Sequence, residues 1–202
     1  LGPRADRPLN AWEEMFLPIR LMEELRRVQV PDASGGLTPL VIQERMLRDS
    51  ARPPEPAGPP FALPWFLGVG MLWGGGLLES ARRGRSGRLG WRVAAFAAGA
   101  GWALLASLAG LLLLGAWLFT DHTFWYPNLN LLQANPLALP LTVAFLSSLR
   151  RGGMPRWGTN LAAALAVGSA LGALLALVPG VGQANGELLA FTLPVNLGLW
   201  AA

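Results

Sequence analysis

Long runs of apolar residues alternate with short polar stretches over the last two thirds of the chain. The runs cover residues 61–78, 93–119, 137–149, 161–178 and 188–202. A membrane-spanning helix needs about 20 predominantly apolar residues, so the run at 93–119 is long enough to cross a bilayer with tilt. The run at 137–149 is short but extends back through LNLLQANP, and the run at 188–202 is short as expected of a truncated helix. The pattern predicts an all-α polytopic membrane protein with about five transmembrane helices.

The first 60 residues follow a different pattern. In NAWEE, Asn10 and Glu13 have the spacing of a capping box, which predicts the start of a helix, and Pro18 breaks or restarts that helix. The stretches VQV and TPLVIQERML flank PDASGG, which predicts a turn between two short strands. SARPPEPAGPP is rich in proline and is expected to be an extended linker.

These patterns divide the chain into three parts. Residues 1–52 are predicted to form a small α+β segment, residues 53–60 a linker, and residues 61–202 a bundle of transmembrane helices. One helix and one hairpin make a thin hydrophobic core for an independent domain. We therefore expect residues 1–52 to be the tail of a larger domain.

Composition supports a membrane protein and excludes several other classes. Hydrophobic residues make up 52% of the chain and charged residues 14%, against about 25% charged in a typical soluble domain. The pI of 11.2 does not indicate a nucleic-acid partner, because half of the sixteen arginines share residues 1–60 with nine acidic residues and the rest lie in two short loops. The sequence has no cysteine, which excludes disulfides, thiolate metal sites and a thiol nucleophile within these residues. No metal or cofactor is predicted.

The distribution of arginine predicts an orientation. The loops at 79–92 and 150–157 carry eight arginines, whereas residues 120–135 and the loop PGVGQANGE carry no basic residue. By the positive-inside rule the two arginine loops are cytoplasmic. Residues 1–60 and 120–135 then face the periplasm, if the chain lies in the inner membrane of a Gram-negative cell.

Small residues recur at helical spacing in two of the apolar runs. Gly70 and Gly74 form one GxxxG pair, Gly168 and Gly172 form another, and Ala164 extends the second pair. Such ladders let helix backbones approach each other closely. A general abundance of glycine and alanine explains the same pattern equally well.

Two prolines and one amide fall within the predicted helices. Pro140 and Pro194 interrupt the third and fifth runs, and Asn196 places an amide at membrane depth. Helix breaks with buried amides occur around binding cavities. A proline kink accompanied by an interhelical hydrogen bond is the alternative interpretation.

One stretch concentrates polar chemistry in this apolar half of the chain. TDHTFWYPNLNLL, at residues 120–132, holds the only histidine and the only tyrosine. Its candidate residues for a polar or lipid-binding site are Asp121, His122, Trp125, Tyr126, Asn128 and Asn130. The serines lie within membrane segments far from the histidine, so no serine-based catalytic triad can be assembled.

Two interpretations of this stretch remain open. An interfacial loop would place its aromatic residues at the lipid headgroups and use Asn128 to cap the next helix. Alternatively, Asp121, His122, Asn128 and Asn130 converge beneath the interface, because an unpaired buried amide or imidazole costs about 1–3 kcal/mol. Such a convergent site would suit a phosphate or a carboxylate.

Two stretches resemble a known family. TDHTFWYPNLNLLQANPLAL resembles the membrane region of the Lnb-like lipoprotein N-acyltransferases of Gram-negative bacteria, and RPLNAWEEMFLPIRLMEELRRV with GGLTPLV is similar to the end of that family's periplasmic domain. The resemblance implies an exported, thiol-dependent catalytic domain followed by a helical membrane bundle. It also implies transfer of an acyl chain to the amino terminus of lipoproteins, with phospholipids as partners.

The sequence departs from that family in one respect that matters for chemistry. Without a cysteine, the acyl-accepting nucleophile cannot be assigned to any residue, and only Asp121, His122, Asn128 and Asn130 match the loop motif. One hypothesis is a membrane-embedded half of an Lnb-like acyltransferase, working with a catalytic part that this sequence lacks. The other is a non-catalytic accessory subunit of a larger respiratory or photosynthetic complex, bound to other membrane subunits.

Overall fold

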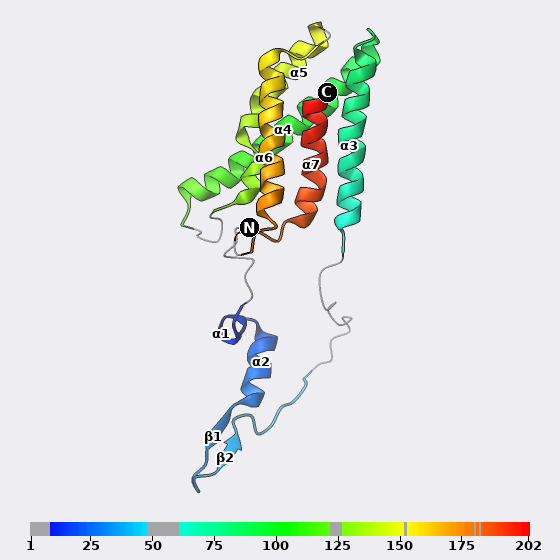
Figure 1. Ribbon diagram of the computed structural model, residues 1–202. Coiled ribbons are helices and arrows are strands. Elements are labelled where there is room, and N and C mark those ends of the chain that lie inside the picture. The colour runs from blue at the N-terminus through cyan, green and yellow to red at the C-terminus, as the bar shows by residue number, and fades with distance from the viewer. Residues whose placement is uncertain (1–8, 48–60, 122–126, 152, 180, 182) are drawn as a thin grey trace. The chain divides into compact units, whose positions relative to one another are not determined.

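The computed structural model describes residues 9–47, 61–121, 127–151, 153–179, 181 and 183–202 (Figure 1). The chain divides into two units, one formed by residues 7–59 and the other mainly by residues 60–202.

The smaller unit begins with two short helices. The predicted capping box is present at α1 (Ala11–Glu14), where the Glu13 N–H donates to the Asn10 side chain at 3.0 Å and the Asn10 N–H donates to Glu13 at 3.1 Å. α2 (Pro18–Arg27) starts at Pro18, since proline has no N–H to lose at a first helical position. Of the two predictions for Pro18, that it breaks the helix or that it restarts it, the second is therefore the one observed.

A β-hairpin follows α2. β1 (Gln29–Pro31) pairs antiparallel with β2 (Leu37–Pro39), and Val30 lies opposite Thr38. The Asp32 carboxylate closes the turn by accepting from the N–H groups of Ser34 and Gly36, each at 2.8 Å. The Ser34 hydroxyl also donates to this carboxylate. Its hydrogen bond, and then those of the two N–H groups, hold the pKa of Asp32 below its ordinary value.

The smaller unit has little hydrophobic core. Among residues 9–47, no side chain whose exposure the structure describes is buried, and Trp12 and Phe16 are largely exposed. A bidentate ion pair links α2 to the chain after β2, with Arg26 Nε donating to Glu44 at 2.7 Å. Polar contacts rather than apolar packing therefore organise these residues.

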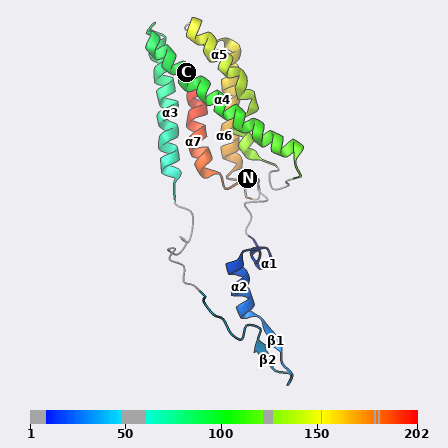
Figure 2. The same ribbon diagram turned by 180° about the vertical axis from the view of Figure 1, so that it is seen from behind.

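Among the residues that the structure describes, the larger unit contains five long helices, and it is here called the bundle. They are α3 (Leu63–Gly84), α4 (Leu89–Phe119), α5 (Leu139–Arg151), α6 (Arg156–Leu175) and α7 (Gly186–Ala201). α7 lies between α3 and α6, and α4 crosses the other helices obliquely (Figures 1 and 2). All five predicted apolar runs are helical.

Three stretches of the described chain are long and apolar enough to cross a membrane. They are α4, residues Leu129–Arg151 and α6. α4 has 31 residues, more than the roughly 20 needed to cross a bilayer, so tilt accommodates its length. The bundle is therefore helical and membrane-spanning, and a small two-stranded sheet lies in the other unit.

Neither of the two prolines that were expected to interrupt a helix ends one. Pro140 is the second residue of α5, so it lies in the first turn rather than interrupting the helix. Pro194 lies inside α7, which nevertheless continues to Ala201.

Close backbone contact joins α3 to α7. A Cβ atom added at Gly70 would lie 2.4 Å from the carbonyl oxygen of Phe191, and one added at Gly74 would lie 2.3 Å from that of Pro194. The contact is reciprocal, because a Cβ at Gly198 would lie 2.5 Å from the Gly74 oxygen. These three glycines let the two helix backbones touch.

The small residues of α6 differ in how closely other parts of the chain pack against them. A Cβ at Gly172 would lie 2.6 Å from Gln133 Nε2, whereas the nearest atom at Gly168 is 3.9 Å away. Ala164 is exposed, because the buried face of α6 runs through Ala162, Leu165, Ala166, Ser169 and Gly172, and residue 164 points away from it. The predicted ladder therefore does not continue through Ala164.

Candidate functional site: a buried amide cluster

The connection between α4 and α5 folds into the bundle. Residues 128–138, here called the buried connection, contain two short 3₁₀ helices, η2 (Leu129–Leu132) and η3 (Pro136–Ala138), which contact α4 and α6. Each begins at an asparagine cap: the Asn128 side chain accepts from the Asn130 N–H at 3.1 Å, and Asn135 accepts from the Leu137 N–H at 2.9 Å. Irregular backbone at membrane depth is stable only where protein or a water-filled cavity surrounds it.

A tight approach to α4 fixes the position of the buried connection. A Cβ added at Gly110 of α4 would lie 2.4 Å from the carbonyl oxygen of Ala134 and 2.7 Å from the Pro136 ring. Only glycine leaves room for the connection here. The sequence of α4 is thus matched to the chain that packs against it.

Gln133 is the centre of a polar cluster inside the bundle. Its side chain is 2% exposed, and its Nε2 donates to the carbonyl oxygen of Ser169 in α6 at 2.9 Å. Its Oε1 accepts from the Ser169 hydroxyl, and from the Thr192 hydroxyl of α7 at 2.8 Å. One amide therefore ties the buried connection to two helices.

Asn196 of α7 extends the cluster toward α4. Its Oδ1 accepts from Trp102 Nε1 of α4 at 2.8 Å, and its Nδ2 lies 3.5 Å from the backbone oxygen of Gln133. Trp102 also packs edge-to-face on Phe191, with ring centroids 5.3 Å apart. The interhelical hydrogen bond at Asn196 is the one that the alternative interpretation of this residue predicted.

The connection between α6 and α7 covers the other side of the cluster. Asn185 Nδ2 donates to Asn130 Oδ1 at 2.6 Å, and the Gln183 side-chain oxygen accepts from the Leu129 N–H. Two amide atoms remain buried without a partner among the described residues, Nδ2 of Asn128 and Oδ1 of Asn185. An unmade hydrogen bond of this kind costs about 1–3 kcal/mol.

The residues predicted for this site have different positions. Asn128 and Asn130 are buried in the cluster, and Asn128 caps a 3₁₀ turn as the interfacial interpretation expected. Asp121, predicted to lie beside them, is instead exposed where α4 ends. His122, Trp125 and Tyr126 lie outside the described residues.

Sequence reasoning missed most of the cluster. Gln133, Gln183, Asn185 and Thr192 were not among the predicted site residues, and Ser169 was considered only as a remote serine. A signal was available, because an amide within an apolar run must find a partner at depth. Tertiary packing decides which group that partner is, so the local sequence does not predict it.

The chemistry of the cluster is hydrogen bonding between neutral groups. No group of three potential metal ligands occurs among the described residues. The Ser169 hydroxyl donates to an amide oxygen and not to a base, so it is not an activated nucleophile. The cluster can position the backbone and bind a polar group, but it has no acid or base of its own.

Comparison with known proteins gives one match. Residues 95–179 match the family described as the Lnb transmembrane domain, from within α4 to just beyond α6. No curated protein and no solved structure matches the chain. The matched range contains the whole buried connection, Gln133 and Ser169. The resemblance to the membrane region of the Lnb-like family that was found in the sequence is therefore confirmed over this range.

Proposed function

We propose that this chain is the membrane-embedded part of an Lnb-like lipoprotein N-acyltransferase. The observation that carries the proposal is the family match at residues 95–179, the range that folds around the buried connection. Since the sequence has no cysteine, a thiol nucleophile would have to come from outside these residues. The bundle would then supply the membrane site at which the acyl chain is transferred.

The amide cluster has a defined role in this proposal. It fixes the buried connection, whose first residues belong to the polar stretch TDHTFWYPNLNLL, against α6, α7 and the connection between them. The unpartnered Nδ2 of Asn128 and Oδ1 of Asn185 offer one donor and one acceptor. A phospholipid headgroup or a lipoprotein amino terminus presents matching groups. In this arrangement the stretch faces the periplasm and the arginine loops face the cytoplasm.

Complementation tests the proposal. The assay uses a Gram-negative strain whose own lipoprotein N-acyltransferase can be depleted, and measures N-acylation from the masses of lipoprotein amino-terminal peptides. We expect no N-acylation with this chain alone, because its hydroxyls are not activated. Supplying the exported thiol domain of an Lnb-like protein alongside it should restore N-acylation.

A matched pair of variants locates the function within the bundle. Gln133→Leu removes the central amide at similar volume and should reduce the restored acylation, whereas Ser147→Ala alters a hydroxyl of α5 outside the cluster and should not. Acylation by this chain alone would refute the assignment of the nucleophile to another part. Failure of the thiol domain to restore acylation with a correctly inserted chain would contradict the proposal itself.

A second candidate function is favoured by the absence of cysteine from all 202 residues. In that case the chain is a non-catalytic accessory subunit of a larger inner-membrane complex. Mild solubilisation and purification would distinguish the two. A stable complex of fixed composition, with no effect of the thiol domain on acylation, would support the accessory function.

A further inference from the structure

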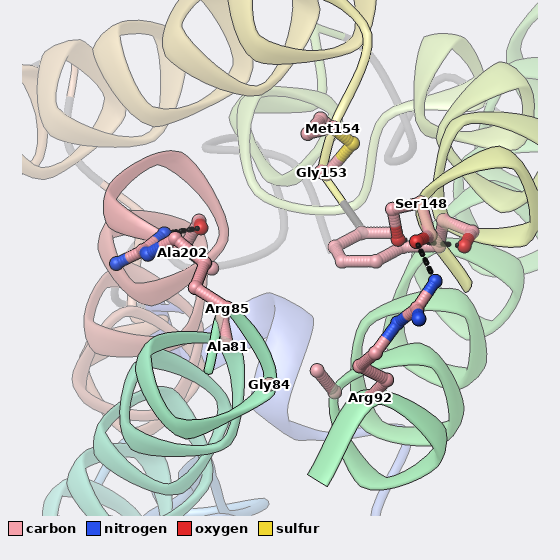
Figure 3. A pocket seen from close by; sticks show the side chains of 10 residues that line it. Ala81, Gly84, Arg85, Arg92, Ser148, Gly153, Met154 and Ala202 are labelled. Carbon is pink, nitrogen blue, oxygen red and sulfur yellow. Dashed lines mark hydrogen bonds between the residues drawn. The ribbon is translucent and has the colours of Figure 1, made fainter. Parts of the chain in front are cut away.

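A cavity lies at the other end of α4 from the buried connection. It has a volume of about 70 Å³, is open on one side, and is bordered by the ends of α3, α5 and α7 and by the start of α4 (Figure 3). Two arginines line it, Arg85 and Arg92, together with Ser148. Figure 3 shows Arg92 directed toward Ser148 and Arg85 directed toward Ala202.

Arg92 has unmet hydrogen-bonding capacity in this cavity. One of its terminal nitrogens donates to the backbone oxygens of Ser148, at 3.4 Å, and Leu149. These bonds satisfy two carbonyl groups in the last turn of α5. The Nε atom of Arg92, however, is buried and has no partner among the described residues.

The positive charge of Arg92 also lacks a counter-ion. No carboxylate side chain lines the cavity, and no described ion pair includes Arg92. Arg92 is half-buried, and a charge that is partly removed from water is stabilised by a partner of opposite charge. The cavity therefore has the electrostatic character of an anion site.

The surroundings strengthen the positive field. This end of the bundle carries Arg82, Arg83, Arg85, Arg88, Arg92, Arg150, Arg151 and Arg156, against the single carboxylate of Glu79. Glu79 is already paired with Arg83 at 2.6 Å. Trp157 and Trp200 are exposed at the same end, as tryptophans are at the level of lipid headgroups.

We propose that this cavity binds the phosphate group of an anionic phospholipid. Arg92 Nε would donate to one phosphate oxygen, and Arg85 at the rim would supply a second guanidinium. A cavity needs about 10–15 Å³ on this measure to hold one water, so 70 Å³ has room for about five to seven waters and is large enough for a phosphate group. The site lies away from the amide cluster and does not depend on acyl transfer.

The test is ligand-dependent thermal stability of the purified chain in neutral detergent. Phosphatidylglycerol should raise the unfolding midpoint by about 2–5 °C, since a ligand that binds only the folded state stabilises it. Phosphatidylcholine, which carries no net charge, should have a smaller effect. Inorganic phosphate forms a third arm: a shift with free phosphate but not with the lipid would identify a phosphate site that is filled by a soluble anion.

Two pairs of variants separate a built site from general charge attraction. Arg92→Gln should weaken phosphatidylglycerol binding about tenfold, whereas Arg88→Gln, with the same charge change on an exposed residue outside the lining, should have less than about a twofold effect. Ser148→Asp places a carboxylate beside Arg92 and should abolish binding. Ser147→Asp, on the same helix but outside the lining, should not.

If Arg92→Gln fails to fold, the comparison of Ser148→Asp with Ser147→Asp still tests the proposal. Ser148→Asp leaves Arg92 in place, so the hydrogen bonds from Arg92 to the last turn of α5 are kept. Equal effects of the two aspartate variants, or equal effects of the two glutamine variants, would overturn the proposal. The same conclusion would follow if neither phosphatidylglycerol nor phosphate changed the midpoint of the unmodified chain.

Discussion

Adding one methyl group at two neighbouring glycines of α3 should have opposite effects on stability. Gly74 faces α7, and a Cβ there would lie 2.3 Å from the oxygen and 2.8 Å from the carbon of the Pro194 carbonyl group. Gly75 faces outward, and a Cβ there would have no neighbour within 4 Å. The same substitution, Gly→Ala, thus tests the backbone contact with an internal control one residue away.

The magnitude follows from the distances. Ordinary carbon–oxygen contact begins near 3.4 Å, so Gly74→Ala requires α3 and α7 to separate by about 1 Å. A gap of that size forfeits a quarter to a half of the dispersion energy along the contact, and overpacking typically costs about 1–3 kcal/mol. We expect Gly74→Ala to lower the free energy of unfolding by about 2–3 kcal/mol. Gly75→Ala should leave it unchanged or raise it by up to about 1 kcal/mol, since alanine is the better helix former.

Reversible unfolding of the chain in mixed micelles, titrated with a denaturing detergent, gives both values. A variant that keeps Trp73 and replaces the other eight tryptophans by phenylalanine gives a local fluorescent reporter, because the Trp73 indole N–H donates to the Ala98 oxygen of α4 at 3.3 Å and its ring contacts Phe191 of α7. If Gly74→Ala proved as stable as Gly75→Ala, the α3–α7 backbone contact would not exist at this distance.

Three further results are expected. Gln133→Leu should destabilise the bundle by about 2 kcal/mol in the same unfolding assay. It removes three side-chain hydrogen bonds, each worth about 0.6 kcal/mol within a membrane. If the variant lost no stability, the cluster would not be formed. In intact cells an impermeant thiol reagent should label Asp121→Cys and not Ser86→Cys, and the reverse pattern would invert the proposed orientation. The turn at Asp32 should loosen only as the pH falls below 3.8, the ordinary pKa of the group. A carboxylate with a lowered pKa stabilises the folded turn above its ordinary pKa, and that contribution is lost as protonation proceeds through the lowered value. The amide chemical shift of Gly36 against pH measures this, and a midpoint at or above 3.8 would contradict the assigned hydrogen bonds.

The helices were predictable because their cause is local. An apolar run in lipid must satisfy its own backbone groups, so each run becomes a helix whatever its neighbours are. The capping box at Asn10 and the hairpin turn at Asp32 are equally local, and both are present. Their hydrogen bonds join residues no more than four positions apart.

The candidate site was less predictable because its contacts are distant in the sequence. Gln133 meets Ser169 across 36 positions and Thr192 across 59. Nor does the run GGG at 74–76 show which glycine touches α7, since all three have the same local propensity. The stretch that resembles the family contains Asn128, Asn130 and Gln133, but the packing of α6 and α7 decides which of its amides are buried and which groups they contact.

The order of synthesis gives the amide cluster a consequence for biogenesis. Gln133 leaves the ribosome before both helices that bind its side chain, since Ser169 of α6 follows it by 36 residues and Thr192 of α7 by 59. At about 5–20 residues per second, the Gln133 side chain waits roughly 3–12 s for Thr192. During this interval the nascent chain holds an amide within an otherwise apolar segment with its hydrogen bonds incomplete. Chains released before α7 is complete should therefore be degraded rapidly, so completion of the cluster acts as a checkpoint on whole-chain synthesis.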